Sequence, residues 1–281
     1  MKNLPIGVFD SGIGGLTVLR GLLRALPGER FVYFGDTARV PYGTKSSETV
    51  LRYSREIAAF LVGSVKKPKI KMLVIACNTA SAVAAKILAK ELPVPVIGVV
   101  EAGAQQAAKM APAGTIAVIA TKATIKSSVY VKYLKQLAPK ARVIAQACPL
   151  FVPLVEEGWS DHPVTRQVAR IYLNFLAKRK PDVLILGCTH YPMIQDTIEK
   201  IVGRQTVIVD SPSAVADCVK KMVPGTIIKM VPGTISLGAQ TPSSAIPRVK
   251  FFISDDPARF KQTATLFLGQ PPVGAVKLTR F

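Results

Sequence analysis

The sequence predicts an α/β fold made of two related halves with mainly parallel sheets, and three observations lead there. Short β-branched runs alternate along the 281 residues with segments whose apolar positions recur three and four apart, as strands and amphipathic helices do. Most of the strand-like runs contain continuous apolar stretches, which is typical of parallel sheets covered by helices on both faces. Several of these segments also recur at a fixed spacing.

The elements follow in order. Strands are expected at residues 6–9, 31–35, 72–76, 95–100, 115–120, 141–147, 182–187, 206–210 and 248–254. The clearest helical patterns lie at residues 16–26, 81–92 and 165–179. Hydrophobic residues make up 49% of the chain and charged residues 19%, which excludes a disordered or fibrous protein and supplies enough apolar material for a large core.

The internal repeat divides the chain. The segments 6–11, 72–79 and 96–100 are echoed by 116–121, 183–190 and 207–210, in each case 110 or 111 residues later. We therefore expect two pseudo-symmetric α/β domains, 1–99 plus 209–281 and 100–208, with the active site in the cleft between them. A second repeat, KMVPGTI at 221–227 and again at 229–235, contains no ionisable group except lysine and is read as a duplicated structural segment.

The charge and cysteine content restrict the partners. Lysine and arginine total 37 against 17 acidic residues, a net charge of +20, which raises the hypothesis of a nucleic-acid partner. The basic residues are spread along the chain without a run of five, so a solvated basic surface is favoured. No 18-residue apolar segment or signal peptide is present, which argues against a membrane partner, and the four cysteines lack the spacing of zinc ligands. A reducing cytoplasm is the expected location.

Ligands of open parallel sheets bind beyond the carboxyl ends of the strands, so the residues that follow each strand deserve inspection. Asp10 and Ser11 open a glycine-rich loop that fails the GxGxxG pattern, because Thr17 replaces its third glycine. Cys77 lies between a strand and a helix N-terminus, where the helix dipole favours a thiolate. Cys188 repeats this setting in the second half, with His190 close by as a proton partner.

Two thiols facing one another across a cleft suit a reaction that needs a base and an acid on opposite faces of one carbon. Racemisation of an amino acid has this requirement and needs neither a pyridoxal lysine nor a metal. The hydroxyls and N–H groups at Ser11, Thr79 and Thr189 are placed to receive the carboxylates of the substrate. Cys148 and Cys218 lack such a setting and are assigned to the core, and His162 is expected to be solvated.

The chain resembles the glutamate racemases, cofactor-independent enzymes of the aspartate/glutamate racemase superfamily. Five motifs between residues 7 and 193 carry the resemblance: GVFDSGIGGLTVL, GDTARVPYG, ACNTAS, CPLFVPLVEEG and LGCTHYPM. It implies two flavodoxin-like halves, usually in a homodimer, that make D-glutamate for peptidoglycan. It further implies that Cys77 and Cys188 are the acid/base pair, that Asp10 assists the first thiol, and that Glu156 and His190 assist the second. The implied substrate-binding residues are Asp10, Ser11, Tyr42, Gly43, Asn78, Thr79, Thr189 and His190, with Thr121 and Thr124 behind them.

Three other functions remain open at this point. Aspartate or hydantoin racemases of the same superfamily carry related motifs, and turnover of each amino acid would separate them. A nucleic-acid-binding protein would show binding that weakens steeply with salt. A redox sensor would require the two cleft thiols to come within disulfide distance.

Overall fold

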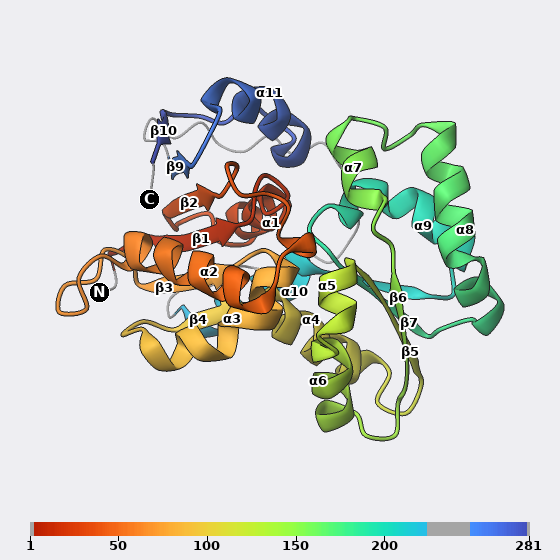
Figure 1. Ribbon diagram of the computed structural model, residues 1–281. Coiled ribbons are helices and arrows are strands. Elements are labelled where there is room, and N and C mark those ends of the chain that lie inside the picture. Colours follow the sequence, from red (N-terminus) through yellow and green to blue (C-terminus); the bar gives the residue numbers. More distant parts are fainter. Residues whose placement is uncertain (1–2, 224–247, 280–281) are drawn as a thin grey trace.

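The computed structural model describes residues 3–223 and 248–279, in which two parallel sheets are each covered by helices (Figure 1). The strands of the first sheet are β1 (Ile6–Asp10), β2 (Phe31–Gly35), β3 (Met72–Ile75), β4 (Val96–Gly98), β9 (Val249–Ile253) and β10 (Val276–Leu278). Those of the second are β5 (Thr115–Ala120), β6 (Arg142–Ala147), β7 (Val183–Gly187) and β8 (Val207–Asp210). Beyond residue 223, the KMVPGTI repeat lies outside the described residues.

The helices connect the strands as crossovers. They are α1 (Leu16–Ala25), α2 (Ser47–Val62), α3 (Asn78–Glu91), α4 (Val99–Met110), α5 (Lys122–Lys126), α6 (Val129–Leu137), α7 (Phe151–Glu156), α8 (Pro163–Arg179), α9 (Gln195–Val202), α10 (Ser211–Met222) and α11 (Pro257–Leu268). Two 3₁₀ turns, η1 (Tyr42–Thr44) and η2 (Tyr191–Ile194), lie in the loops. No described helix is long and apolar enough to cross a membrane.

Both sheets contain the same strand order. The first reads β10-β9-β2-β1-β3-β4 and the second β6-β5-β7-β8, with every paired strand parallel. In each, the first strand of the half lies between the second and the third, which is the flavodoxin-like order with its switch point beside the first strand. The repeated segments of the sequence therefore occupy equivalent strands: β1 matches β5, β3 matches β7 and β4 matches β8. The expectation of an α/β fold with mainly parallel sheets is confirmed.

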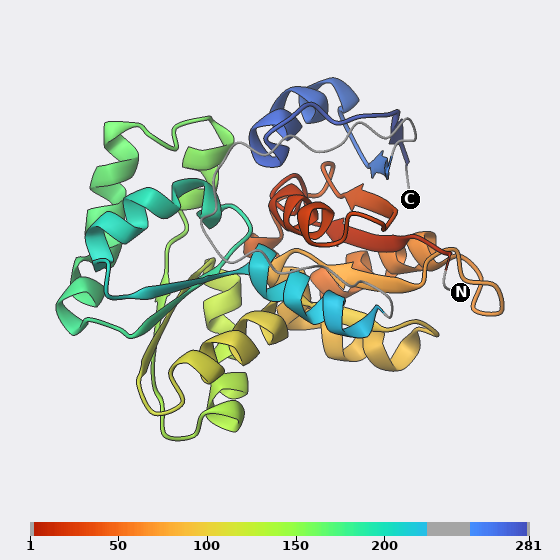
Figure 2. The same cartoon turned by 180° about the vertical axis from the view of Figure 1, so that it is seen from behind.

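Three apolar clusters hold the layers together. Helices α2 and α3 cover one face of the first sheet through Ile57 and Leu88, and α4 and α6 cover one face of the second through Ala104 and Leu134. A third cluster covers the remaining faces of both sheets and continues from α1, α10 and α11 to α8 and α9. Figure 2 shows α10 lying where the two halves meet. The third cluster crosses from one half to the other, so they share part of their core.

One strand end and one additional strand differ most from the sequence analysis. The strand expected at 95–100 ends at Gly98, and Val99 already begins α4, because these buried valines pack equally well at the first turn of a covered helix. Strand β10 was not foreseen, since it has only three residues and follows a segment rich in proline and glycine. The strands of the first proposed domain lie in the six-stranded sheet and those of the second in the four-stranded one, except that β8 extends across the proposed boundary between residues 208 and 209; the domain limits themselves stay a prediction.

Candidate active site

A cavity of about 350 Å³ lies between the two sheets at the carboxyl ends of their strands. Ten of the eleven expected site residues line it: Ser11, Tyr42, Gly43, Cys77, Asn78, Thr79, Glu156, Cys188, Thr189 and His190. Its volume suits a small amino acid. Asp10 does not line this cavity. Its side chain is 1% exposed and lies beneath the Ser11 loop.

Cys77 lies two residues after the end of β3 and is the N-cap residue of α3. Its Sγ accepts a hydrogen bond from the backbone N–H of Ala80 at 3.4 Å, and the Ser11 side chain also bonds to the thiol. Burial, and to a smaller extent the nearby Asp10 carboxylate, nevertheless raise the pKa of Cys77 to about 12. The helix N-terminus does favour the thiolate, as expected, because the Ala80 N–H lowers the pKa, but desolvation of the charged sulfur outweighs both hydrogen bonds.

Asp10 is held in place at the end of β1. Its Oδ2 accepts a hydrogen bond from the backbone N–H of Gly12 at 2.9 Å, while the buried Oδ1 has no hydrogen-bond partner among the described residues. Burial raises the pKa of Asp10 above its usual value, and His190 partly offsets this. A buried carboxyl group with a raised pKa next to Cys77 is a suitable proton exchanger for that thiol.

Cys188 follows β7 and has a different set of neighbours. Its Sγ lies 3.8 Å from Nδ1 of His190, whose Nε2 lies 2.9 Å from Oε1 of Glu156. Although burial alone lowers the pKa of His190, the hydrogen bonds to Cys188 and Glu156 raise it to about 10. Sulfur, imidazole and carboxylate thus form a continuous chain from β7 to α7. Here η2, a 3₁₀ turn with Pro192 at its start, replaces the α-helix expected after the second cysteine.

Three threonine hydroxyls meet across the cleft. Oγ1 of Thr79 on α3 lies 3.2 Å from Oγ1 of Thr121 and 3.3 Å from that of Thr124, and the latter two are 3.1 Å apart. Asn78 is fixed beside them, because it donates to Ser211 Oγ at 3.2 Å and accepts from the Tyr130 hydroxyl at 2.7 Å. The polar wall of the cavity is therefore assembled from both halves.

The glycine-rich loop after β1 packs directly on the second cysteine motif. A Cβ atom at Gly14 would lie 2.4 Å from both Cε1 of His190 and Oγ1 of Thr189. Thr17 donates its hydroxyl to the carbonyl oxygen of Thr189 at 2.9 Å. The departure from GxGxxG at Thr17 thus has a structural reason, since this side chain joins the two halves.

Other lining residues carry little sequence signal. Tyr42 lines the cavity, and its hydroxyl donates to the carboxylate of Asp36, which does not line it. The sequence analysis missed Thr44 and also Lys122 on α5, whose position directly after Thr121 could have indicated it. It quoted the other lining residues only as members of two motifs, GDTARVPYG for Val40 and Pro41 and CPLFVPLVEEG for Pro149, Val152 and Pro153. Within residues 3–223 and 248–279, no cluster of His, Cys, Asp and Glu side chains could hold a metal ion.

The structure also places the two other cysteines and His162, which the sequence analysis assigned outside the site. Cys148 is fully buried in the core, and Cys218 is partly buried on α10. His162 is exposed, and its Nδ1 accepts the backbone N–H of Val164 at the start of α8. These residues do not contact the cavity.

The comparison with known proteins matches this geometry to a family. A model of the Asp/Glu/hydantoin racemase family matches residues 6–219. The chain belongs to this family. It is therefore an amino-acid racemase, an isomerase.

Its relatives cover nearly the whole chain. A glutamate racemase of Geobacter metallireducens is 47% identical over 94% of this chain and 92% of its own length, and one of Syntrophus aciditrophicus is 44% identical over 98% and 97%. Among solved structures, a glutamate racemase isoform of Bacillus anthracis superposes with a TM-score of 0.87 at 35% identity, covering 100% of this chain and 99% of that one. The glutamate racemase of Francisella tularensis, solved with D-glutamate, gives 0.83 at 33% identity, covering 99% and 98%.

Proposed function

We propose that this racemase interconverts L- and D-glutamate by a two-base mechanism in which Cys77 and Cys188 exchange the α-proton. The observation that carries the proposal is that both thiols line one cavity from the ends of equivalent strands, β3 and β7, in the two sheets. Each half thus contributes one thiol to the same space, as a reaction on opposite faces of one carbon requires.

The steps follow from these positions. One cysteine, as thiolate, takes the α-proton, so that a C–H bond breaks, an S–H bond forms and the electron pair stays on the substrate carbon. The opposite thiol then delivers its proton to the other face of that carbon and becomes the thiolate. The two cysteines have exchanged roles, and the reverse reaction uses the same path.

Different groups support the two thiols. A protonated His190, held by Glu156, stabilises negative charge on Cys188 through the 3.8 Å contact with its sulfur. Burial raises the pKa of Cys77, and the hydrogen bonds from Ala80 and Ser11 stabilise its thiolate. Asp10 exchanges a proton with this thiol. The site therefore pairs a cationic partner on one side with a carboxyl group on the other.

Substrate recognition is assigned to the polar wall. The first turn of α3 presents backbone N–H groups near Asn78 and Thr79, and Ser11 and Thr189 add hydroxyls from the other strand ends. Such groups bind carboxylates well, because a helix N-terminus favours negative charge. Tyr42 and Gly43 also line the cavity. With two carboxylates on the substrate, the same wall has donors for each of them.

The mechanism predicts that Cys77→Ala and Cys188→Ala each abolish racemisation, whereas Cys148→Ala keeps it. The first two remove the thiol that exchanges the α-proton on their side of the substrate, while Cys148 lies in the core and contributes to packing. Circular dichroism of L- and D-glutamate, with L- and D-aspartate as the alternative substrates, measures turnover. Full activity of either cleft variant would refute the two-base assignment, and faster turnover of aspartate would refute the substrate assignment.

We propose the cellular role that glutamate racemases have. D-glutamate made here would enter peptidoglycan, and the two cleft thiols require a compartment that keeps them reduced, for which we propose the cytoplasm. We also propose a homodimer, which sedimentation of the purified protein tests.

A further inference from the structure

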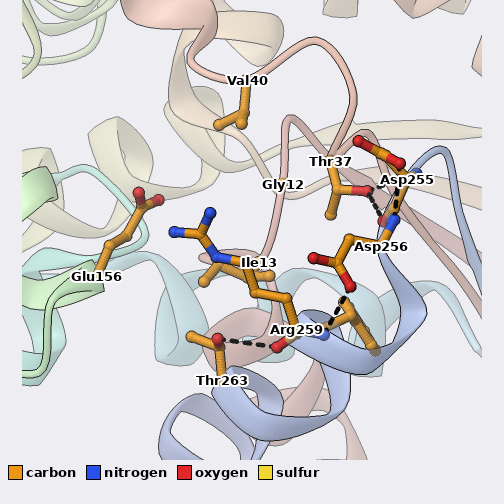
Figure 3. Close-up of a pocket in the computed structure, with 10 residues that line it drawn as sticks. Gly12, Ile13, Thr37, Val40, Glu156, Asp255, Asp256, Arg259 and Thr263 are labelled. Carbon is orange, nitrogen blue, oxygen red and sulfur yellow. Dashed lines mark hydrogen bonds between the residues drawn. The ribbon is translucent and has the colours of Figure 1, made fainter.

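A second, smaller pocket of about 170 Å³ adjoins the substrate cavity on the side of α11 (Figure 3). Gly12 and Val40 from the first sheet's loops line it together with Glu156 of α7, and α11 contributes Arg259. Val40 and Glu156 line both spaces, so the two pockets share a wall. This pocket therefore brings the carboxylate behind His190 next to the C-terminal helix.

The backbone of Arg259 is held by a hydrogen bond, whereas its guanidinium group has no ion-pair partner among the described residues. Its backbone N–H donates to Oδ1 of Asp256, the residue that caps α11, at 2.9 Å. Its side chain is exposed, and it forms no ion pair with any acid in the described part of the chain. Figure 3 shows the guanidinium pointing across the pocket toward the carboxylate of Glu156.

Glu156 has an oxygen available for such a partner. Oε1 holds Nε2 of His190, while no hydrogen bond joins Oε2 to another described residue. The two other acids of the pocket are already used at the start of α11, where Asp256 accepts the N–H of Arg259 and Asp255 accepts the N–H of Asp256. Of the three carboxylates, Glu156 is the one toward which the guanidinium extends.

We propose that Arg259 is a positioning residue for the racemase reaction, pairing with the second oxygen of Glu156 and so holding this carboxylate on His190. The inference rests on the proposed role of Glu156 and His190 beside Cys188. A guanidinium suits the task, because its planar donors fix the orientation of a carboxylate as well as attract its charge. In this way α11, from the end of the chain, supports the thiol that follows β7.

The test compares Arg259→Ala, Arg259→Lys and the control Lys261→Ala, which removes an exposed cation two residues further along the same helix and away from the pocket. We expect Arg259→Ala to lower kcat for glutamate by roughly tenfold, the size of coupling seen between charged groups in contact, with little change in KM. Arg259→Lys should restore part of the loss, and Lys261→Ala should match the parent. The thermal unfolding midpoints of the variants and the parent should stay equal. A cation in the first turn of a helix is not stabilised by the helix dipole, so removing Arg259 costs no such stabilisation.

A double-mutant cycle identifies the partner. If Arg259 acts through Glu156, adding Arg259→Ala to Glu156→Gln should cause no further loss of kcat. An unchanged kcat in Arg259→Ala, or an undiminished effect of this change on top of Glu156→Gln, would overturn the inference. So would full activity of Glu156→Gln, whereas the proposed two-thiol function fails only through the cysteine variants and is judged separately.

Discussion

At the residue scale, the two thiols are chemically equivalent but their surroundings are not. Cys77 is backed by a buried carboxyl group, and Cys188 by an imidazole that a second carboxylate holds. The pKa of His190 is raised to about 10 only because its two partners outweigh the cost of burying its charge. Its protonation thus depends on both partners, the Cys188 sulfur and the Glu156 carboxylate of α7.

This dependence predicts a pH effect on stability. A group whose pKa is raised by folding stabilises the protein fully below its unfolded value, near 6.5, and this contribution is lost as the pH rises through about 10. Glu156→Gln should lower the pKa of His190 and remove part of this contribution. Urea unfolding at several pH values should show the parent more stable than the variant at pH 6, with the difference shrinking toward pH 10. A difference that is constant or grows over this range would contradict the assignment.

At the scale of elements, the glycine-rich loop after β1 meets the second cysteine motif through a close approach that only glycine permits. The loop between β1 and α1 rests on Thr189 and His190 at Gly14, and Thr17 bonds to the carbonyl of Thr189. Two elements from different halves are therefore held together at the site, with the Gly14 backbone against the His190 and Thr189 side chains.

We therefore expect Gly14→Ala to be damaging. The added methyl would lie 2.4 Å from His190 and Thr189, so the loop and the imidazole must separate, at a cost of about 1–3 kcal/mol in stability and a large loss of kcat. Gly28→Ala is the matched control, since nothing lies within 4 Å of its Cβ position. Chemical unfolding and racemase assays measure both. Equal activity of the two variants would show that the close approach is not required.

The sequence predicts the elements better than the contacts between them. Nine strands and the position of both cysteines follow from apolar runs and from a repeat, because burial on two faces leaves a continuous signal in the residues of β3 and β7. The pKa of Cys77 could not be predicted in the same way, since it is set by burial and by Asp10, which is distant in sequence. Lys122 and Arg259 likewise line their pockets only because the two halves and α11 pack together, and the sequence does not encode that packing locally.

At the scale of the whole molecule, the substrate cavity belongs to neither half alone. The Thr79, Thr121 and Thr124 hydroxyls and the Thr17 bond link the halves at the site, and one apolar cluster continues through both. A ligand in this cavity contacts both sheets and so stabilises their association together with their folds.

Glutamate should therefore raise the thermal midpoint of one cooperative transition. At a concentration about 100 times the dissociation constant, a ligand that binds only the native state adds about 2.7 kcal/mol of stability. We expect both enantiomers of glutamate to produce the shift and aspartate to produce a smaller one at equal concentration. Differential scanning calorimetry measures it. A shift confined to one of two separate transitions would show that the substrate is bound by one half.

Different proton-exchanging groups lie beside the two thiols, and this asymmetry affects the kinetics of the two directions differently in kcat and KM. Two enantiomers have the same free energy in water, so the equilibrium constant of their interconversion is one at every pH. The quotient kcat/KM must then be identical in the two directions, however different Asp10 and the His190–Glu156 pair are as proton exchangers. Any directional preference created by this asymmetry has to appear as compensating changes in kcat and KM, with the slower direction binding its substrate more tightly.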